Sequence, residues 1–164
     1  MNARPEILFP LFAALTGLEG VGPKTAVNMA GLGVEKPRDL LFLIPFSGID
    51  RTLKSSVQGA DLPATLTVEI EIGAHRPARN KGGAYRIDVI DTQISFQLVY
   101  FHARGDYLSK LLPTGQRRIV SGKVELFDGI AQMTHPDHVV RIEDAAQIPS
   151  FEPVYPLTAG VTQK

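Results

Sequence analysis

The spacing of apolar and polar residues changes once along the chain, from a helical period to a strand period. In the first part, apolar residues recur three and four positions apart, as in Leu11, Leu15 and Leu18, which predicts short amphipathic helices. Pro23 suits the first turn of one such helix, because a helix start leaves that N–H unpaired in any case. We therefore expect short helices separated by turns over residues 10–43.

From residue 64 onward, apolar and polar residues alternate, which is the period of a half-buried strand. A helix of about two turns fits residues 106–112, and the dipeptide Asp128-Gly129 favours a tight hairpin. Five strands with a helix between the third and the fourth form the order of an OB-fold. The prediction is a mainly β fold, a five-stranded OB-fold (Greek-key) barrel preceded by a short helical hairpin segment. The expected strands are residues 64–72, 85–89, 94–101, 118–126 and 130–134.

The same patterns predict how the chain is divided. Its 164 residues, of which 44% are hydrophobic, suffice for one compact core. We expect a helical segment over residues 1–45 and a barrel over residues 64–145. Residues 46–63 are rich in Gly, Ser, Asp and Pro without a clear period, so they are predicted to be a linker, and residues 146–164 to be a second linker.

The charge is unevenly distributed although the formal net charge is zero. Residues 75–123 contain nine cations and three acids, a net charge of +6, whereas the flanks sum to −2 and −4. If the fold brings these cations together, a polyanion is the expected partner. If it does not, they form an ordinary solvated surface of mixed charge.

Several classes of chemistry are excluded by composition. Without cysteine there is no disulfide, thiol nucleophile or cysteine-ligated zinc site, and the four histidines lack the spacing of metal ligands. No apolar run approaches the length of a membrane span, and the N-terminus lacks the design of a signal peptide. We expect a soluble, cytoplasmic protein without a metal site.

A glycine-rich turn over residues 20–26 has the composition of a helix-hairpin-helix turn, whose N–H groups face a phosphate. Lys24 would add a cation there. The alternative is a helix-packing turn without a ligand. The segment also comes close to a nucleotide-binding phosphate loop, but Pro23 removes a backbone donor and a helical period precedes it, so we reject an NTPase.

The second candidate feature is a group of aromatic and basic residues at the end of the third predicted strand. Strict alternation places Phe101 on the wetter face, with Tyr107 shortly after it and His102 and Arg104 between them. Rings interleaved with cations are typical of sites that bind unstacked bases. Alternatively, Phe101 packs as core under the helix that follows.

A set of short segments shares one further pattern. They are residues 18–26, residues 39–45 followed by Asp50-Arg51-Thr52, Tyr100-Phe101-His102, Tyr107-Leu108, Gly115, Gly122-Lys123, residues 132–136 and residues 153–158. Their order and spacing resemble the N-terminal wedge region of the bacterial ATP-dependent DNA helicase RecG. His102 stands where that family usually has asparagine, which leaves the geometry of the stacking loop open.

This resemblance implies a wedge that grips branched DNA, such as stalled forks and Holliday junctions, and splits its strands in recombination and repair. It implies no cofactor for this part, and ATP with magnesium for a helicase motor that would follow residues 146–164. A contact with single-strand-binding protein is left open. In that family, aromatic residues after the third strand stack on separated bases, and the matching positions here are Tyr100, Phe101 and Tyr107.

We therefore predict a non-catalytic DNA-binding wedge, in which cations hold phosphates and aromatic rings part the bases. The runner-up is an OB-fold module that binds protein and makes no nucleic-acid contact. The predicted DNA contacts are Phe101, Tyr107, Tyr100, His102, Arg104, Arg76, Arg79, Lys81, Arg86, Arg117, Lys123 and Lys24.

Overall fold

The computed structural model describes residues 5–80 and 82–161, and it divides into two compact units. One unit comprises residues 49–152, and the other comprises residues 1–48 with 153–164. The division falls within strands β1 (Ser47–Asp50) and β9 (Phe151–Val154), which pair with each other. Each unit is described below by itself.

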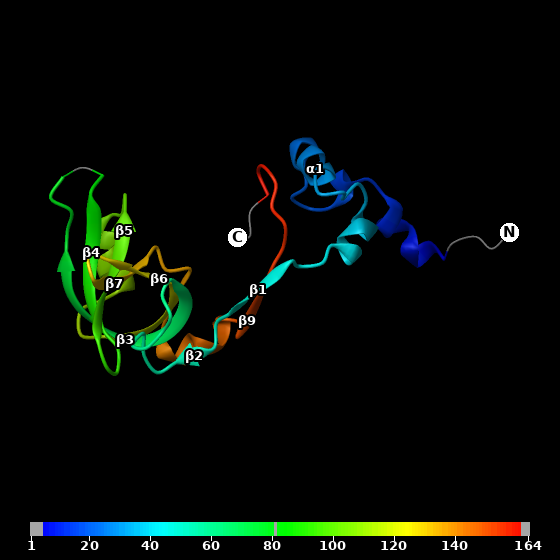
Figure 1. Cartoon of the computed structure of the whole chain (residues 1–164). Coiled ribbons are helices and arrows are strands. Elements are labelled where there is room, and N and C mark those ends of the chain that lie inside the picture. Colours follow the sequence, from blue (N-terminus) through cyan, green and yellow to red (C-terminus); the bar gives the residue numbers. More distant parts are fainter. Residues whose placement is uncertain (1–4, 81, 162–164) are drawn as a thin grey trace. The chain divides into compact units, whose positions relative to one another are not determined.

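Five strands of the 49–152 unit close into a barrel (Figure 1). Their spatial order is β3–β4–β5–β7–β6, and β6 returns to pair with β3 in antiparallel register. Helix α2 (Gly105–Leu111) lies between the third and the fourth barrel strands in the sequence. This is the OB-fold order, so the predicted fold class is confirmed. The strands are β3 (Ala64–Arg76), β4 (Ala84–Ile90), β5 (Ser95–Phe101), β6 (Arg117–Phe127) and β7 (Ile130–Thr134).

The barrel core follows directly from the alternation in the sequence. Val68, Ile70 and Ile72 of β3 are fully buried, and they meet Leu98 of β5 and Met133 of β7 in one cluster. Burying such a side chain stabilises the fold by about 1.5–3 kcal/mol relative to leaving it exposed. The period of two therefore determines both the strands and the face that each presents to the core.

A break in the β3–β4 pairing lies close to the loop that joins these two strands. The register shifts between Ile72 and His75, and a Cβ atom on Gly73 would lie 2.8 Å from the backbone oxygen of Asp88. Glycine therefore permits this close approach. Beyond the shift, His75 Nε2 donates to the carbonyl oxygen of Leu112 at 2.8 Å, and its Nδ1 accepts from the Tyr85 hydroxyl at 3.0 Å. These bonds fix the end of β3.

The helical segment differs from the expectation in the type of helix. Among its described residues, 5–45, only α1 (Pro23–Ala30) is an α-helix, whereas three other turns are 3-10 helices. They contain few residues, and Pro10 inside the first of them cannot donate a backbone hydrogen bond. The 3-10 helices are η1 (Glu6–Phe12), η2 (Leu15–Gly17) and η3 (Pro37–Phe42).

The two segments expected to be linkers contain regular structure. Residues 49–63 belong to the same compact unit as the barrel, strand β2 (Leu53–Lys54) pairs in parallel with β3, and Val57 enters the core. A few side-chain contacts hold this segment, and such contacts leave no period in the sequence. Near the other end, β8 (His138–Val140) pairs with β6, η4 (Ile142–Gln147) follows, and β9 lies within residues 146–164.

One of these contacts is made by the buried carboxylate of Asp91. It accepts hydrogen bonds from the Ser56 hydroxyl and from the backbone N–H groups of Val57, Gln93 and Ile94, at 2.7–3.0 Å. Burial by itself would raise the pKa of this carboxyl. The N–H groups of Ile94, Val57 and Gln93, with the Ser56 hydroxyl, outweigh burial and lower the pKa below its usual 3.8.

We expect this carboxylate to make the stability of the barrel depend on pH in acid. A lowered folded-state pKa stabilises the protein above the unfolded value of 3.8, and that contribution is lost as the pH falls through the folded value. Asp91→Asn should therefore cost about 1–3 kcal/mol at pH 7 and flatten the decline of the urea midpoint below about pH 4. Parallel pH profiles for wild type and Asp91→Asn would contradict this. Asp61→Asn, at an exposed carboxylate, is the control.

Candidate nucleic-acid interface

Phe101 ends β5 and faces away from the barrel core. Its side chain is 43% exposed, whereas Phe96, Leu98 and Tyr100 on the opposite face of the strand are buried. The ring is therefore on the wetter face, as the alternation predicted, and it is not a core residue under α2. An exposed phenyl ring at a strand end is available for stacking.

His135 holds the exposed ring of Phe101 from one side. The backbone N–H of Phe101 donates to His135 Nε2 at 3.1 Å, and the two rings lie 5.9 Å apart with an interplanar angle of 38°. His135 lies directly after β7 with a positive φ of 48°. A ring fixed by a neighbour loses less freedom when a base stacks on it. No sequence pattern assigned a role to His135, so this contact with Phe101 was missed.

The other aromatic candidates occupy two different environments. Tyr107, in the first turn of α2, is 63% exposed and available to a ligand. Tyr100 is only 9% exposed. Burial is the main cause that raises the pKa of its hydroxyl, and the nearby Tyr107 is a smaller one. The Tyr100 ring packs edge-on against His135 at 5.7 Å. Tyr100 is therefore a core residue, and the structure removes it from the candidates for base stacking.

Three of the predicted cations lie together beside Phe101. Arg76, Arg79 and Arg86 line one concave surface of about 430 Å³ at the loop between β3 and β4. Ala84 lines the same surface and pairs with Phe101 in the β4–β5 register. We call this surface the β3–β4 basic surface. Its cations and the exposed ring are at the same end of the barrel.

Two further candidates continue this region onto α2. His102 is exposed, has a positive φ of 55°, and lines a neighbouring concave surface of about 630 Å³ with residues of the β3–β4 loop. Arg104 is exposed and is the N-cap residue of α2. The turn that contains both residues therefore joins the Phe101 strand end to the Tyr107 helix.

Two further predicted cations, both on β6, do not line this surface. On β6, Arg117 forms an ion pair with Glu69 at 2.8 Å, and Lys123 forms one with Glu125 at 3.2 Å. Lys24 is exposed on α1, in the other compact unit. Lys81 lies outside the described residues. Arg117 lines a different concave surface, so the fold does not bring all the cations of residues 75–123 together at the β3–β4 basic surface.

The glycine turn before α1 does not form the expected two-helix motif. Gly20 has a φ of +79°, which favours glycine, and Gly22 is the N-cap residue of α1. On the other side, however, the turn is preceded only by η2, a 3-10 helix of three residues. The candidate phosphate site at Lys24 therefore lacks the first helix of a helix-hairpin-helix.

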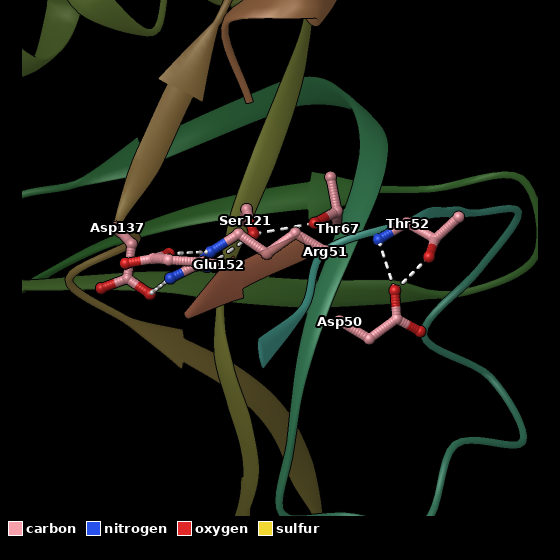
Figure 2. Close-up of polar contacts among 7 residues, drawn as sticks. All are labelled: Asp50, Arg51, Thr52, Thr67, Ser121, Asp137 and Glu152. Carbon is pink, nitrogen blue, oxygen red and sulfur yellow. Dashed lines mark hydrogen bonds and ion pairs between the residues drawn. The ribbon is translucent and has the colours of Figure 1, made fainter. Parts of the chain in front are cut away.

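The structure also reveals a buried arginine that the sequence pattern did not single out. Arg51 is 4% exposed, and Figure 2 shows its guanidinium between two carboxylates and a hydroxyl. Its Nε donates to Glu152, its Nη1 to Ser121 Oγ at 2.9 Å, and its Nη2 to Asp137 at 3.1 Å. Ser121 in turn accepts from the Thr67 hydroxyl at 2.8 Å.

This group, Arg51 with Thr67, Ser121, Asp137 and Glu152, is called the Arg51 cluster below. It lies next to a short turn in which the Asp50 carboxylate accepts from the hydroxyl and backbone N–H of Thr52 (Figure 2). These bonds lower the pKa of Asp50 to about 2. The only signal for the cluster in the sequence was the Asp50-Arg51-Thr52 motif, because its other members are distant along the chain.

The described residues contain neither a cluster of side chains that could hold a metal ion nor a helix that could span a membrane. Across residues 5–80 and 82–161, no group of three or more His, Asp or Glu residues could hold a metal ion. In the same residues, every helix is too short or too polar to cross a membrane. The features that this part of the chain provides are an exposed ring, guanidinium groups and concave surfaces.

Comparisons with known proteins give one consistent result. The family model of the RecG wedge domain matches residues 16–164. The chain is 25% identical over 151 residues to the ATP-dependent DNA helicase RecG of Pasteurella multocida, and 28% identical over 151 residues to that of Streptococcus pneumoniae. These matches cover 91% and 89% of this chain but only 22% and 21% of the relatives, so the chain spans about a fifth of their length.

A solved structure gives the same architecture. The structure of RecG bound to a three-way DNA junction matches with a TM-score of 0.66 at 23% identity, and covers 92% of this chain and 21% of that one. At this identity the match supports the fold alone.

Proposed function

Because this chain belongs to the RecG wedge domain family, we propose that its barrel is the DNA-binding wedge of an ATP-dependent DNA helicase. In this role the barrel grips branched DNA, such as a stalled fork or a Holliday junction, and separates strands at the branch point. The chain itself carries out no covalent chemistry. Its contribution is to bind phosphates and to provide a surface on which paired bases part.

The observation that carries the proposal is the exposed ring of Phe101 beside the β3–β4 basic surface. A base that leaves its pair loses stacking on one side, and an exposed ring replaces part of that contact at about 1–3 kcal/mol per base. Tyr107 offers a second exposed ring on α2. Together the two rings would favour the parted strands over the closed duplex.

The arginines supply the phosphate contacts that hold the strands at the ring. Arg79 and Arg86 line the same concave surface as Arg76, whose Nη2 lies 2.6 Å from the carboxylate of Asp88. The Arg76 side chain is largely exposed, so this ion pair contributes little to stability and can be exchanged for a phosphate. No base-edge readout is expected, because the described residues that line this surface belong to β3, β4 and the loop between them and none belongs to a helix.

We further propose that ATP and magnesium act in the whole protein and outside these residues. The relatives are named as ATP-dependent helicases. Within residues 5–80 and 82–161, no group of three or more His, Asp or Glu residues could hold a metal ion, and Pro23 removes a backbone donor from the glycine-rich turn over residues 20–26. Strand separation by this barrel would therefore depend on a motor that drives DNA against it.

The salt dependence of DNA binding tests this function. Three phosphate contacts by Arg76, Arg79 and Arg86 predict a slope of about −2.7 in log affinity against log salt. From these contacts alone, the affinity for a three-way fork should fall at least about 40-fold between 50 and 200 mM salt. Fluorescence anisotropy with a labelled fork and a linear duplex measures this, and the fork should bind more tightly at each salt concentration. An affinity that does not change with salt would exclude phosphate binding as the main contact.

Protein binding is the second candidate function, and the β6–β7 hairpin favours it. Leu126, Phe127 and Ile130 are exposed around the turn at Asp128-Gly129. A cluster of exposed apolar side chains is typical of a contact with another protein, and single-strand-binding protein would be a candidate partner for it. This binding would depend little on salt and would be lost in Phe127→Ser, whereas fork binding would be unaffected by that change.

A further inference from the structure

A second group of cations lies between α2, β6 and β8, and the function proposed above does not use it. Two concave surfaces of about 250 and 500 Å³ share Arg118 and Arg141 in their linings. Lys110, in the last turn of α2, lines the first surface, and Arg117 lines the second. We call these four residues and the surfaces they line the β6–β8 groove.

The strand register brings two of these cations next to each other. β6 and β8 are antiparallel and pair Ile119 with Val140, so Arg118 and Arg141 are the next residues at the same end of the pair. Like charges that face each other on neighbouring strands repel and destabilise a sheet. A bound anion that contacts both guanidinium groups would remove this repulsion.

Arg118 is held firmly in this position. Its Nε donates to the carbonyl oxygen of Leu111 at 3.2 Å, its Nη1 to that of Arg117 at 2.8 Å, and its Nη2 to Gln116 Oε1 at 2.8 Å. A guanidinium has five N–H donors, so two remain after these bonds. The group is therefore ordered in advance and keeps donors for a ligand.

Acidic residues next to the groove do not cancel its charge. Glu143 lies 3.7 Å from Arg141, but both side chains are 68% exposed, so the pair is weak. Asp144 also lines the groove and accepts a hydrogen bond from Gln147. Arg117 is paired with Glu69. The cations Lys110, Arg118 and Arg141 thus face Glu143 and Asp144, which leaves the three with an excess of one positive charge.

The lining of the groove indicates which form of nucleic acid it would take. Sites for single strands combine cations with aromatic rings. The residues that line the β6–β8 groove include Lys, Arg, Gln, Leu, Val and Ile, but no aromatic residue. Such a surface can contact the phosphate backbone and offers no aromatic ring on which an unpaired base could stack. A duplex, whose bases stay paired, matches this surface.

We propose that the β6–β8 groove binds the phosphodiester backbone of a duplex arm, through Arg118, Arg141 and Lys110. This inference rests on the proposed function and adds a second contact to it. The parted bases would lie on Phe101, and the duplex that has not been opened would lie in the groove. One barrel would then hold branched DNA on both sides of the branch point.

Charge reversal on the full chain tests this assignment. Arg141→Glu and Lys110→Glu leave the hydrogen bonds of Arg118 intact, and Lys54→Glu, on exposed β2, is the matched control because it changes the net charge equally. Each groove variant should bind a linear 15-bp duplex about tenfold more weakly at 50 mM salt, with the salt slope reduced by about 1. The control should bind as wild type does.

The outcomes separate this proposal from the proposed function. Groove variants should lose affinity equally for duplex and fork, whereas Phe101→Ala should lose it for the fork alone. If Arg141→Glu and Lys54→Glu bind the linear duplex equally, the groove assignment is overturned and the Phe101 wedge is unaffected. If the groove variants instead lose binding to a poly-glutamate peptide and keep the duplex, the groove is a protein site. If Phe101→Ala leaves fork binding unchanged while the groove variants weaken binding, the wedge role of Phe101 is overturned and the groove assignment is supported.

Discussion

Phe101→Ala is expected to weaken binding to a three-way DNA fork by about 5- to 150-fold, and to leave binding to linear duplex close to wild type. The range corresponds to the loss of one stacked base, about 1–3 kcal/mol. The duplex has no unpaired base to offer, so it does not use the ring. Anisotropy titrations with both DNAs in the same buffer measure the ratio of the two affinities, which cancels general effects on the protein.

The structure favours a large effect because the ring is both exposed and fixed. Its side chain is 43% exposed, and its own backbone N–H is bound to His135, whose ring lies beside it. The substitution removes surface that the barrel core does not use, so the melting temperature should change little. His135→Ala should reproduce part of the loss on the fork, since it removes the support and keeps the ring.

Two further variants control for this result. Phe101→Tyr keeps an aromatic face and should retain most of the fork preference, whereas Phe101→Leu keeps apolar bulk without a ring and should not. Phe127→Ala removes another exposed ring of the same barrel, on the β6–β7 hairpin, and should bind both DNAs as wild type does. Equal losses on fork and duplex for Phe101→Ala would show that the ring does not part bases.

The strands were predictable because one physical rule determines them. In β3 and β5, alternate residues point to the core and to the outer face of the sheet. The burial of Ile70 and the exposure of Phe101 both follow from this alternation. The hairpin at Asp128-Gly129 has the turn residues that its geometry needs, with φ of 50° and 77°. Residues 6–42 gave a weaker pattern, and most of their helical turns are 3-10.

The site was only partly predictable, because it depends on which residues meet across the barrel. The cations of the β3–β4 loop are close in sequence, so their convergence could be expected. That Arg118 and Arg141 lie next to each other follows from the β6–β8 register, and no local pattern encodes it. The contacts of Arg51 were even less predictable, because its three acceptors lie 70 or more positions away in the sequence. A single arginine also produces no periodic pattern that could indicate its burial.

That buried arginine leads to the second large effect, which is on stability. Arg51→Met is expected to destabilise the barrel by about 3 kcal/mol. Removing one partner of a buried ion pair usually costs about 3–5 kcal/mol, and the lower end applies because Asp137 is partly exposed and can be hydrated. For a unit of this size the melting temperature should fall by about 12 °C or more. Thermal unfolding followed by circular dichroism measures this.

The substitution tests the geometry of the Arg51 cluster as well as its charge. Arg51→Lys keeps the charge but has one ammonium group, which cannot bond Glu152, Ser121 and Asp137 from three separate nitrogens, so it should restore less than half of the loss. Lys54→Met, which removes an exposed cation three residues away, should leave the melting temperature within about 1–2 °C of wild type. A similarly small change in Arg51→Met would exclude a stabilising role for the cluster.

The location of the cluster also predicts where the protein loosens. Arg51 bonds Glu152 through its side chain and Ser150 through its backbone N–H, at 2.9 Å, so it connects the two places where the chain enters and leaves the 49–152 unit. In Arg51→Met, the backbone amide at position 51 should exchange with solvent faster than it does in wild type. This acceleration should be at least tenfold larger than that of the backbone amide of Val68, in the β3 core. Equal acceleration of both amides would instead mean that the cluster stabilises the barrel only as a whole, because local opening affects some amides and global unfolding affects all of them.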